Sequence, residues 1–116
     1  MLLDMVVTGH RIERKVEIDE FLELMKNYSK EKIECTKHTF FRLSEKQRKI
    51  FKDEDILRYI LEQKPIFVGT QYNGAYAVFY DYKEKDVIRI VLDIKPNKIE
   101  VVTFYIIDKK QVPIIK

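Results

Sequence analysis

The fold depends mainly on residues 66–108, which read IFVGTQYNGAYAVFYDYKEKDVIRIVLDIKPNKIEVVTFYIID. Runs rich in valine, isoleucine, tyrosine and phenylalanine alternate here with short polar turns, a pattern typical of β-strands. The dipeptide Asn73-Gly74 separates the first two runs and is the strongest short signal for a hairpin, because both residues tolerate positive φ. The stretch therefore predicts a four-stranded antiparallel meander with strands at 66–72, 75–82, 87–94 and 99–107.

The spacing of apolar residues before Pro65 is helical instead. Ile18, Phe21, Leu22 and Met25 predict a helix over 19–28. Asp53 is the expected N-cap of a second helix, whose apolar face consists of Ile56, Leu57, Ile60 and Leu61 and which ends before Pro65. The region between them predicts a short strand at 33–36 and a helix that begins after Thr36, while residues 5–16 are either an extra strand or a loose arm. Helices followed by an antiparallel sheet define an α+β fold, with the N-terminal helices packed on one face of the sheet.

Length and composition limit the possible classes of protein. A chain of 116 residues with 46% hydrophobic residues is sufficient for one domain with one core, so 1–116 is expected to be a single domain. Cys35 is the only cysteine, and no ligand cluster is apparent, so neither a disulfide, a metal nor another cofactor is expected. No apolar stretch approaches the roughly 20 residues that span a bilayer, and the start lacks a basic leader. The chain is therefore expected to be cytoplasmic, with no membrane partner.

The balance of charges leaves the partner open. The net charge of +3 permits binding to a phosphate backbone but is too small to indicate it. Charged residues make up 35% of the chain, and lysine, glutamate and isoleucine are abundant, which is typical of proteins from thermophiles.

The most informative local feature is the pair His38 and Arg42. Residues four apart lie on one face of a helix, so an imidazole that titrates near neutral pH and a permanent cation can address the same phosphate. This pair makes nuclease chemistry worth testing.

Several short motifs occur in an order that resembles a known group of proteins. They are Thr36-Lys37-His38, Arg42, Arg48, Asp53-Glu54-Asp55-Ile56 and Val101-Val102-Thr103-Phe104-Tyr105. Together they resemble a small domain-of-unknown-function family that is similar to the RelE and BrnT toxins, which share the barnase-like architecture of microbial ribonucleases. The resemblance divides the chain into an N-terminal extension with a helix (1–30) and a RelE/BrnT-like α+β core (31–108).

The resemblance implies a metal-independent endoribonuclease of a toxin-antitoxin system, with RNA as substrate and an antitoxin protein as partner. In such an enzyme the 2′-hydroxyl attacks the adjacent phosphate, which requires a base, an acid and cations. His38 is then the acid or base, and Arg42 and Arg89 bind the phosphate. Tyr105 donates a proton or stacks on a base, and Arg48 and Thr103 bind RNA. These side chains are expected to converge on the exposed face of the sheet.

Each of these residues also has a structural interpretation. His38 can be a helix cap or a surface residue, Arg42 can pair with Glu45 or Asp55, and Arg89 can form an ion pair between strands. Most tyrosines of the sheet are expected to serve in packing.

Two further functions remain open. Asp81 and Asp93-Ile94-Lys95 resemble the acidic and acid-x-lysine pattern of metal-dependent restriction-type nucleases, although such a tripeptide arises readily by chance. The alternative without catalysis is a small interaction or inhibitor protein of a mobile element, which would bind its partner through a sheet edge or the N-terminal arm.

Overall fold

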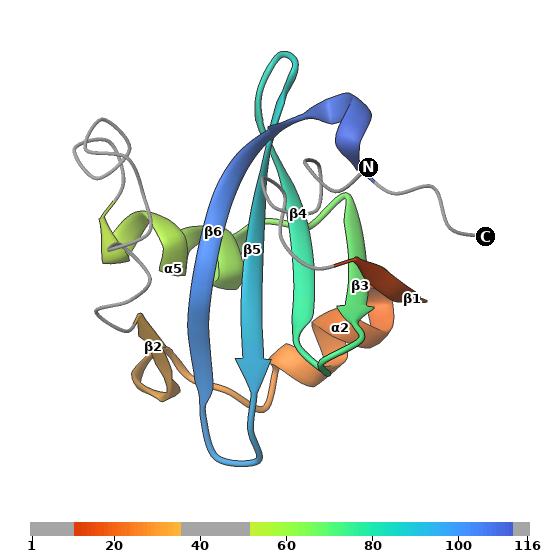
Figure 1. Ribbon diagram of the computed structural model, residues 1–116. Helices are drawn as coiled ribbons and strands as arrows, with labels where there is room; N and C mark the ends of the chain where they lie inside the picture. The colour runs from red at the N-terminus through yellow and green to blue at the C-terminus, as the bar shows by residue number, and fades with distance from the viewer. Residues whose placement is uncertain (1–10, 36–51, 113–116) are drawn as a thin grey trace.

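A computed structural model describes residues 11–35 and 52–112 of the chain. The predicted helix after Thr36, with His38, Arg42 and Arg48, lies outside these residues. The described part is an α+β fold whose two α-helices pack against a single curved sheet (Figure 1).

The sheet has six strands in the described residues, in the order β1-β3-β4-β5-β6-β2. The prediction of a four-stranded antiparallel sheet is thus correct for the central meander and wrong for the whole sheet, which is mixed. The strands are β1 (Ile12–Val16), β2 (Ile33–Cys35), β3 (Phe67–Gln71), β4 (Tyr76–Lys83), β5 (Asp86–Ile94) and β6 (Ile99–Asp108).

The hairpin between β3 and β4 forms at the predicted dipeptide. Gly74 has a φ of +90°, a conformation that glycine adopts at low cost. The Gln71 amide donates to the Ala75 carbonyl at 2.8 Å, and the Gly74 amide donates to the Gln71 carbonyl at 2.9 Å. These bonds fix the register in which Phe67 faces Phe79.

The two additional strands flank the meander. β1 pairs antiparallel with β3, and β2 pairs parallel with β6, where Ile33 is opposite Ile99. In β1 only Ile12 and Val16 are buried, and the three residues between them are exposed. A strand with so few buried residues gives a weak signal in the sequence, which is why it could equally be interpreted as a loose arm.

The strand β6 contains an irregularity that changes which residues share a face. Thr103 pairs with Val91, but the next residue of β5, Leu92, pairs with Val101, so Val102 is an additional residue. Such a β-bulge shifts the alternation by one position. Val101 therefore packs with Phe104 in the core under the helices. Without the bulge, the alternation of side chains along a strand would place Val101 on the same face as Thr103.

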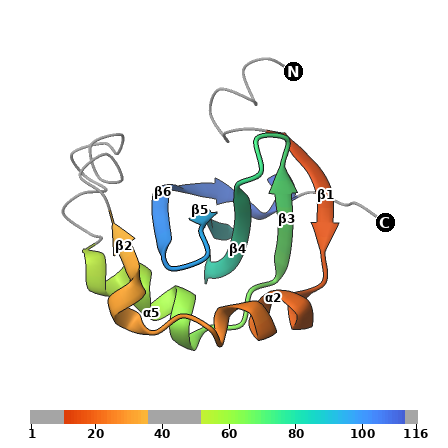
Figure 2. The same ribbon diagram turned by 90° about the horizontal axis from the view of Figure 1, so that it is seen from below.

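The helices α2 (Ile18–Met25) and α5 (Asp53–Glu62) lie on the same face of the sheet (Figure 2). Both are close to the predicted ranges. Lys52, rather than Asp53, is the N-cap of α5, and its amide donates to the Asp55 carboxylate at 2.9 Å. The main core lies between these helices and the sheet and includes Phe21, Ile56, Ile60, Val78, Tyr80, Ile88, Ile90, Leu92, Val101 and Phe104.

The opposite face of the sheet is also buried over much of its area. A second apolar cluster there comprises Ile12, Phe67, Ala77, Phe79, Val87 and Ile107, against which Val112 packs. The sheet therefore has a hydrophobic layer on both faces, and the predicted site residues of β5 and β6 have to be located relative to this second layer.

Candidate functional site

Arg89 is a buried charged residue on the face of the sheet opposite the helices. It lies in β5, where its register partners are Phe79 of β4 and Tyr105 of β6. Its side chain is only 4% exposed. A guanidinium retains its charge at any ordinary pH, so a buried arginine requires polar or aromatic neighbours to compensate for the lost water.

Two such neighbours surround the guanidinium. Its Nη2 donates to Oε1 of Gln71 at 2.9 Å, and its Cζ lies 5.3 Å from the centre of the Phe79 ring. The second distance is within the range of a cation–π interaction. Phe67 contacts the same phenyl ring edge-on, at 5.5 Å between centroids. Arg89 is therefore held between the amide oxygen of Gln71 and the ring of Phe79.

Gln71 is a functional candidate that the sequence interpretation missed. It is 3% exposed, and its Nε2 donates to Oδ1 of Asn73 at 3.2 Å. The same Oδ1 accepts a hydrogen bond from the Ala75 amide at 3.1 Å. The sequence did contain a signal for Gln71. Gln71 continues the alternation of Phe67 and Gly69 along the strand, which predicts that it faces the buried side of the sheet, where glutamine is uncommon.

Thr103 is the second predicted residue on this face. It is 3% exposed and pairs with Val91, two residues along the strands from the Arg89–Tyr105 pair. Its Oγ1 is buried and has no hydrogen-bond partner among the described residues. Burial of a hydroxyl without a hydrogen-bond partner costs free energy. Oγ1 of Thr103 is therefore a candidate to form a hydrogen bond with a ligand or a water.

The structure therefore places Arg89 and Thr103 on the same face of neighbouring strands, and it makes Tyr105 the backbone register partner of Arg89. The other three predicted site residues, His38, Arg42 and Arg48, lie outside the described residues. The expectation that the site lies on an exposed face is wrong for Arg89 and Thr103. Their neighbours on this face, Ala77 and Phe79, are apolar and fully buried, so the face is part of a packed layer.

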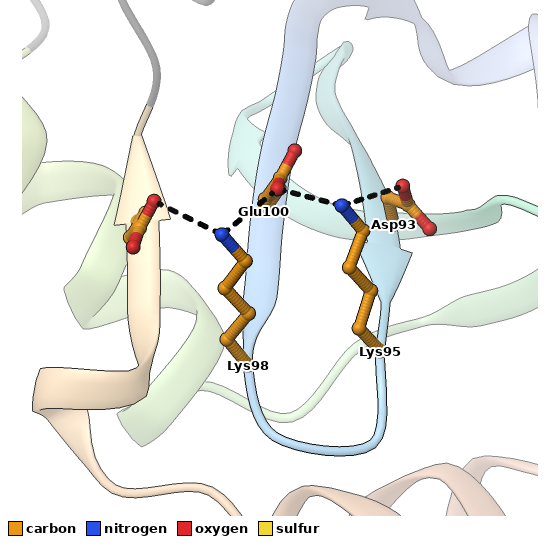
Figure 3. Close-up of polar contacts among 5 residues, drawn as sticks. Asp93, Lys95, Lys98 and Glu100 are labelled. Carbon is orange, nitrogen blue, oxygen red and sulfur yellow. Dashed lines mark hydrogen bonds and ion pairs between the residues drawn. The ribbon is translucent and has the colours of Figure 1, made fainter.

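A different charged cluster lies at the turn between β5 and β6 (Figure 3). Nζ of Lys95 is 2.8 Å from Glu100 and 3.9 Å from Asp93, and Nζ of Lys98 is 3.3 Å from Glu100 and 3.9 Å from Glu34 of β2. Hydrogen bonds from Lys95 and Lys98 lower the pKa of Glu100, and the bond to Glu100 raises the pKa of Lys95. Carboxylates and ammonium groups thus alternate in one chain of ion pairs.

This cluster does not support a metal-dependent nuclease. Asp81 pairs in register with Val87, which is about 20 Å along β5 from Asp93 at the usual rise per residue. Asp81 contacts Lys109 instead, at 3.2 Å. Within 11–35 and 52–112, no three side chains of the types that bind metals form a group that could hold an ion. The two acids of the restriction-type pattern therefore lie at opposite ends of the β4–β5 hairpin, Asp81 in β4 and Asp93 in β5.

A groove lies between the two helices on the other face of the molecule. Its apolar lining consists of Leu22, Met25, Ile60 and Leu61, and polar residues at or just after the ends of the two helices also line it: Lys26, Glu62, Gln63 and Lys64. Leu61 is 42% exposed there. Among the described helices, none is long and apolar enough to cross a membrane.

Comparison with protein families places the chain in a family. A model of the MJ0788 family matches residues 19–92, which include β2, α5, β3 and β4 with most of α2 and β5. No curated protein and no solved structure matched the chain. The matched range includes Gln71 and Arg89 and ends before Thr103 and Tyr105.

Proposed function

The chain belongs to the MJ0788 family, and we propose that it is a metal-independent endoribonuclease. The observation that carries the proposal is that Arg89 and Thr103 are both buried on one face of the sheet, in the neighbouring strands β5 and β6. A fixed cation, and on the same face a hydroxyl without a hydrogen-bond partner among the described residues, are groups that bind phosphate oxygens. Tyr105 is the backbone register partner of Arg89.

In the proposed reaction, the 2′-hydroxyl of one nucleotide attacks its own 3′-phosphate. His38 removes or returns the proton, and Arg89 and Arg42 stabilise the charge that develops on the phosphate. Thr103 donates to a phosphate oxygen, Tyr105 protonates the leaving 5′-oxygen or stacks on a base, and Arg48 contacts the RNA backbone. The products are a 2′,3′-cyclic phosphate and a free 5′-hydroxyl.

We also propose where this enzyme acts and which kind of protein inhibits it. A ribonuclease of this type acts on RNA in the cytoplasm and is restrained by an antitoxin protein, as the resemblance to RelE and BrnT toxins implies. The composition, with 35% charged residues, favours a protein adapted to high temperature.

The test is cleavage of a mixed RNA pool in EDTA, with the product ends identified. We expect cyclic phosphates from the wild type, and a loss of about 10²–10⁴-fold in rate for His38→Ala, as for removal of a general acid or base. Arg89→Lys, which keeps the charge but loses the planar fork, is expected to lose about 10²–10³-fold. Arg58→Lys is the matched control, because Arg58 is an exposed arginine of α5 that pairs with Asp55 at 3.1 Å.

A second candidate is an interaction protein without catalytic activity, and the burial of Arg89 and Thr103 favours it. Side chains that are 4% and 3% exposed within an apolar layer also suit a purely structural role. If folded wild type cleaves no RNA with or without Mg²⁺, while Arg89→Lys mainly lowers thermal stability, the ribonuclease proposal is wrong and this candidate replaces it.

A further inference from the structure

We infer that Gln71 is a positioning residue that fixes the orientation of the Arg89 guanidinium for catalysis. This inference rests on the proposed function. It assigns a role to a buried amide that lies in β3, two strands away from Arg89 in β5.

The two side chains meet along the strands, on the face opposite the helices. In register, Gln71 is at the hairpin end of β3, whereas Arg89 is opposite Phe79, further from the hairpin. Ala77 of β4 lies between these two levels and is fully buried. Because the alanine side chain is small, the guanidinium can extend over β4 toward the hairpin and reach Oε1 of Gln71 at 2.9 Å.

The hairpin fixes which end of the Gln71 amide faces the arginine. Oδ1 of Asn73 accepts from the Ala75 amide at 3.1 Å, so this atom is an acceptor and the side chain of Asn73 is anchored to the turn. An acceptor at that position requires the nitrogen of the Gln71 amide, which donates to it at 3.2 Å. The oxygen of Gln71 is therefore directed to Arg89, and the opposite orientation would bring an NH₂ group against a cation.

The backbone of Gln71 is equally constrained. Its amide and its carbonyl both take part in the turn, with Ala75 and Gly74 respectively. The turn, Asn73, Gln71 and Arg89 thus form one continuous series of hydrogen bonds that ends on Nη2. A guanidinium held at Nη2 and over the Phe79 ring has lost most of its rotational freedom, which lowers the entropy cost of binding a phosphate.

The experiment compares three variants by NMR and by kinetics. Gln71→Met removes the acceptor at nearly constant volume, and Asn73→Ala leaves Gln71 and Arg89 unchanged but removes the acceptor that orients the amide. Asn73→Asp is the matched control, because a carboxylate oxygen can accept both bonds that Oδ1 accepts in the wild type. The NMR measurement is the rate of rotation about the Nε–Cζ bond of Arg89, which does not depend on activity.

We expect slow rotation in the wild type and in Asn73→Asp, and faster rotation in Gln71→Met and Asn73→Ala. In the cleavage assay, we expect the first pair to be equally active and the second pair to lose at least tenfold in kcat with little change in KM, because the oriented cation acts on the charge that develops in the transition state. Unchanged rotation and full activity in both Gln71→Met and Asn73→Ala would overturn the inference alone. A wild type that is inactive while Arg89 rotates slowly would instead overturn the proposed function, and with it the role of Gln71 in catalysis.

Discussion

Tyr80 and Tyr28 show how differently two tyrosine hydroxyls of this small domain are accommodated. Tyr80 is 1% exposed in the main core, and its hydroxyl has no hydrogen-bond partner among the described residues. Burial raises the pKa of this hydroxyl, so it stays neutral and remains a buried donor. The hydroxyl of Tyr28, in contrast, donates to the Lys95 carbonyl at 2.6 Å and links the segment after α2 to the β5–β6 turn.

The same substitution is therefore expected to have opposite effects at the two positions. Tyr80→Phe removes a polar atom without a partner and should raise the free energy of unfolding by about 1 kcal/mol. Tyr28→Phe removes a hydrogen bond and should lower it by about 1 kcal/mol. Urea unfolding of both variants and the wild type measures these differences. A destabilised Tyr80→Phe would show that its hydroxyl has a partner after all, such as a buried water.

At the scale of elements, β1 depends on the absence of a side chain at position 69. A Cβ built on Gly69 would lie 2.5 Å from Cγ2 of Ile12 and 3.1 Å from the Arg14 carbonyl, both in β1. It would also lie 3.2 Å from the ring of Phe67. β1 can therefore pair closely with β3 only because residue 69 is glycine.

Gly69→Ala is expected to displace β1 while the rest of the sheet remains. The overpacking should cost about 1–3 kcal/mol of stability, and the amides of β1 should exchange with solvent faster than those of β4 and β5. Gly74→Ala is a useful comparison, because a Cβ there meets no atom within 4 Å and its cost comes only from the positive φ. Hydrogen exchange followed by NMR distinguishes the two. Equal protection of β1 in Gly69→Ala and the wild type would contradict the expectation.

The elements that the sequence predicted well are those whose signals are local. The β3–β4 hairpin follows from Asn73-Gly74, and α5 follows from apolar residues three and four apart before Pro65. The parallel pairing of Ile33 with Ile99 joins distant parts of the chain, and a three-residue strand carries no pattern that selects its partner. The bulge at Val102 was equally hidden, because an additional valine beside Val101 leaves the apolar composition of β6 unchanged.

The candidate site was predictable only in part for the same reason. Arg89 and Thr103 were selected by their types and their strands, and they do share a face. Their burial depends on Ala77 and Phe79 in the neighbouring strand, and the contact of Arg89 with Gln71 crosses β4. Residues close to Arg89 in the sequence encode neither feature. The burial of Arg89 and Thr103 and the contact with Gln71 can therefore be recognised only once the strands of the sheet are placed side by side.

At the scale of the whole molecule, the ion pairs around Glu100 connect β2 to the end of the meander. Glu34 of β2 lies 3.9 Å from Lys98, which in turn lies 3.3 Å from Glu100 of β6. β2 has only three residues and pairs with β6 alone among the described strands. The ion pairs therefore supplement a short ladder of backbone hydrogen bonds, and the stability of this edge should depend on pH.

The direction of that dependence follows from Glu100. Hydrogen bonds from Lys95 and Lys98 lower the pKa of Glu100 in the folded protein, so the stabilisation is fully present above the ordinary value of 4.5 that the unfolded chain has. It is lost as the pH falls through the lowered folded value. The wild type should thus lose thermal stability between about pH 5 and pH 2, and Glu100→Gln should lose less over the same range.

Thermal unfolding at a series of pH values checks this prediction, with Glu84→Gln, an exposed residue of the β4–β5 turn, as the control. Other carboxylates titrate in the same range, so the informative quantity is the difference in midpoint between each variant and the wild type. For Glu100→Gln this difference should shrink as the pH falls, because protonation removes the same charge in the wild type. For Glu84→Gln it should stay nearly constant. Added salt should also reduce the difference for Glu100→Gln at pH 7, since exposed ion pairs are screened. A difference that is independent of both pH and salt would mean that Glu100 stabilises this edge of the sheet through packing, and that the chain of ion pairs adds nothing to the pairing of β2.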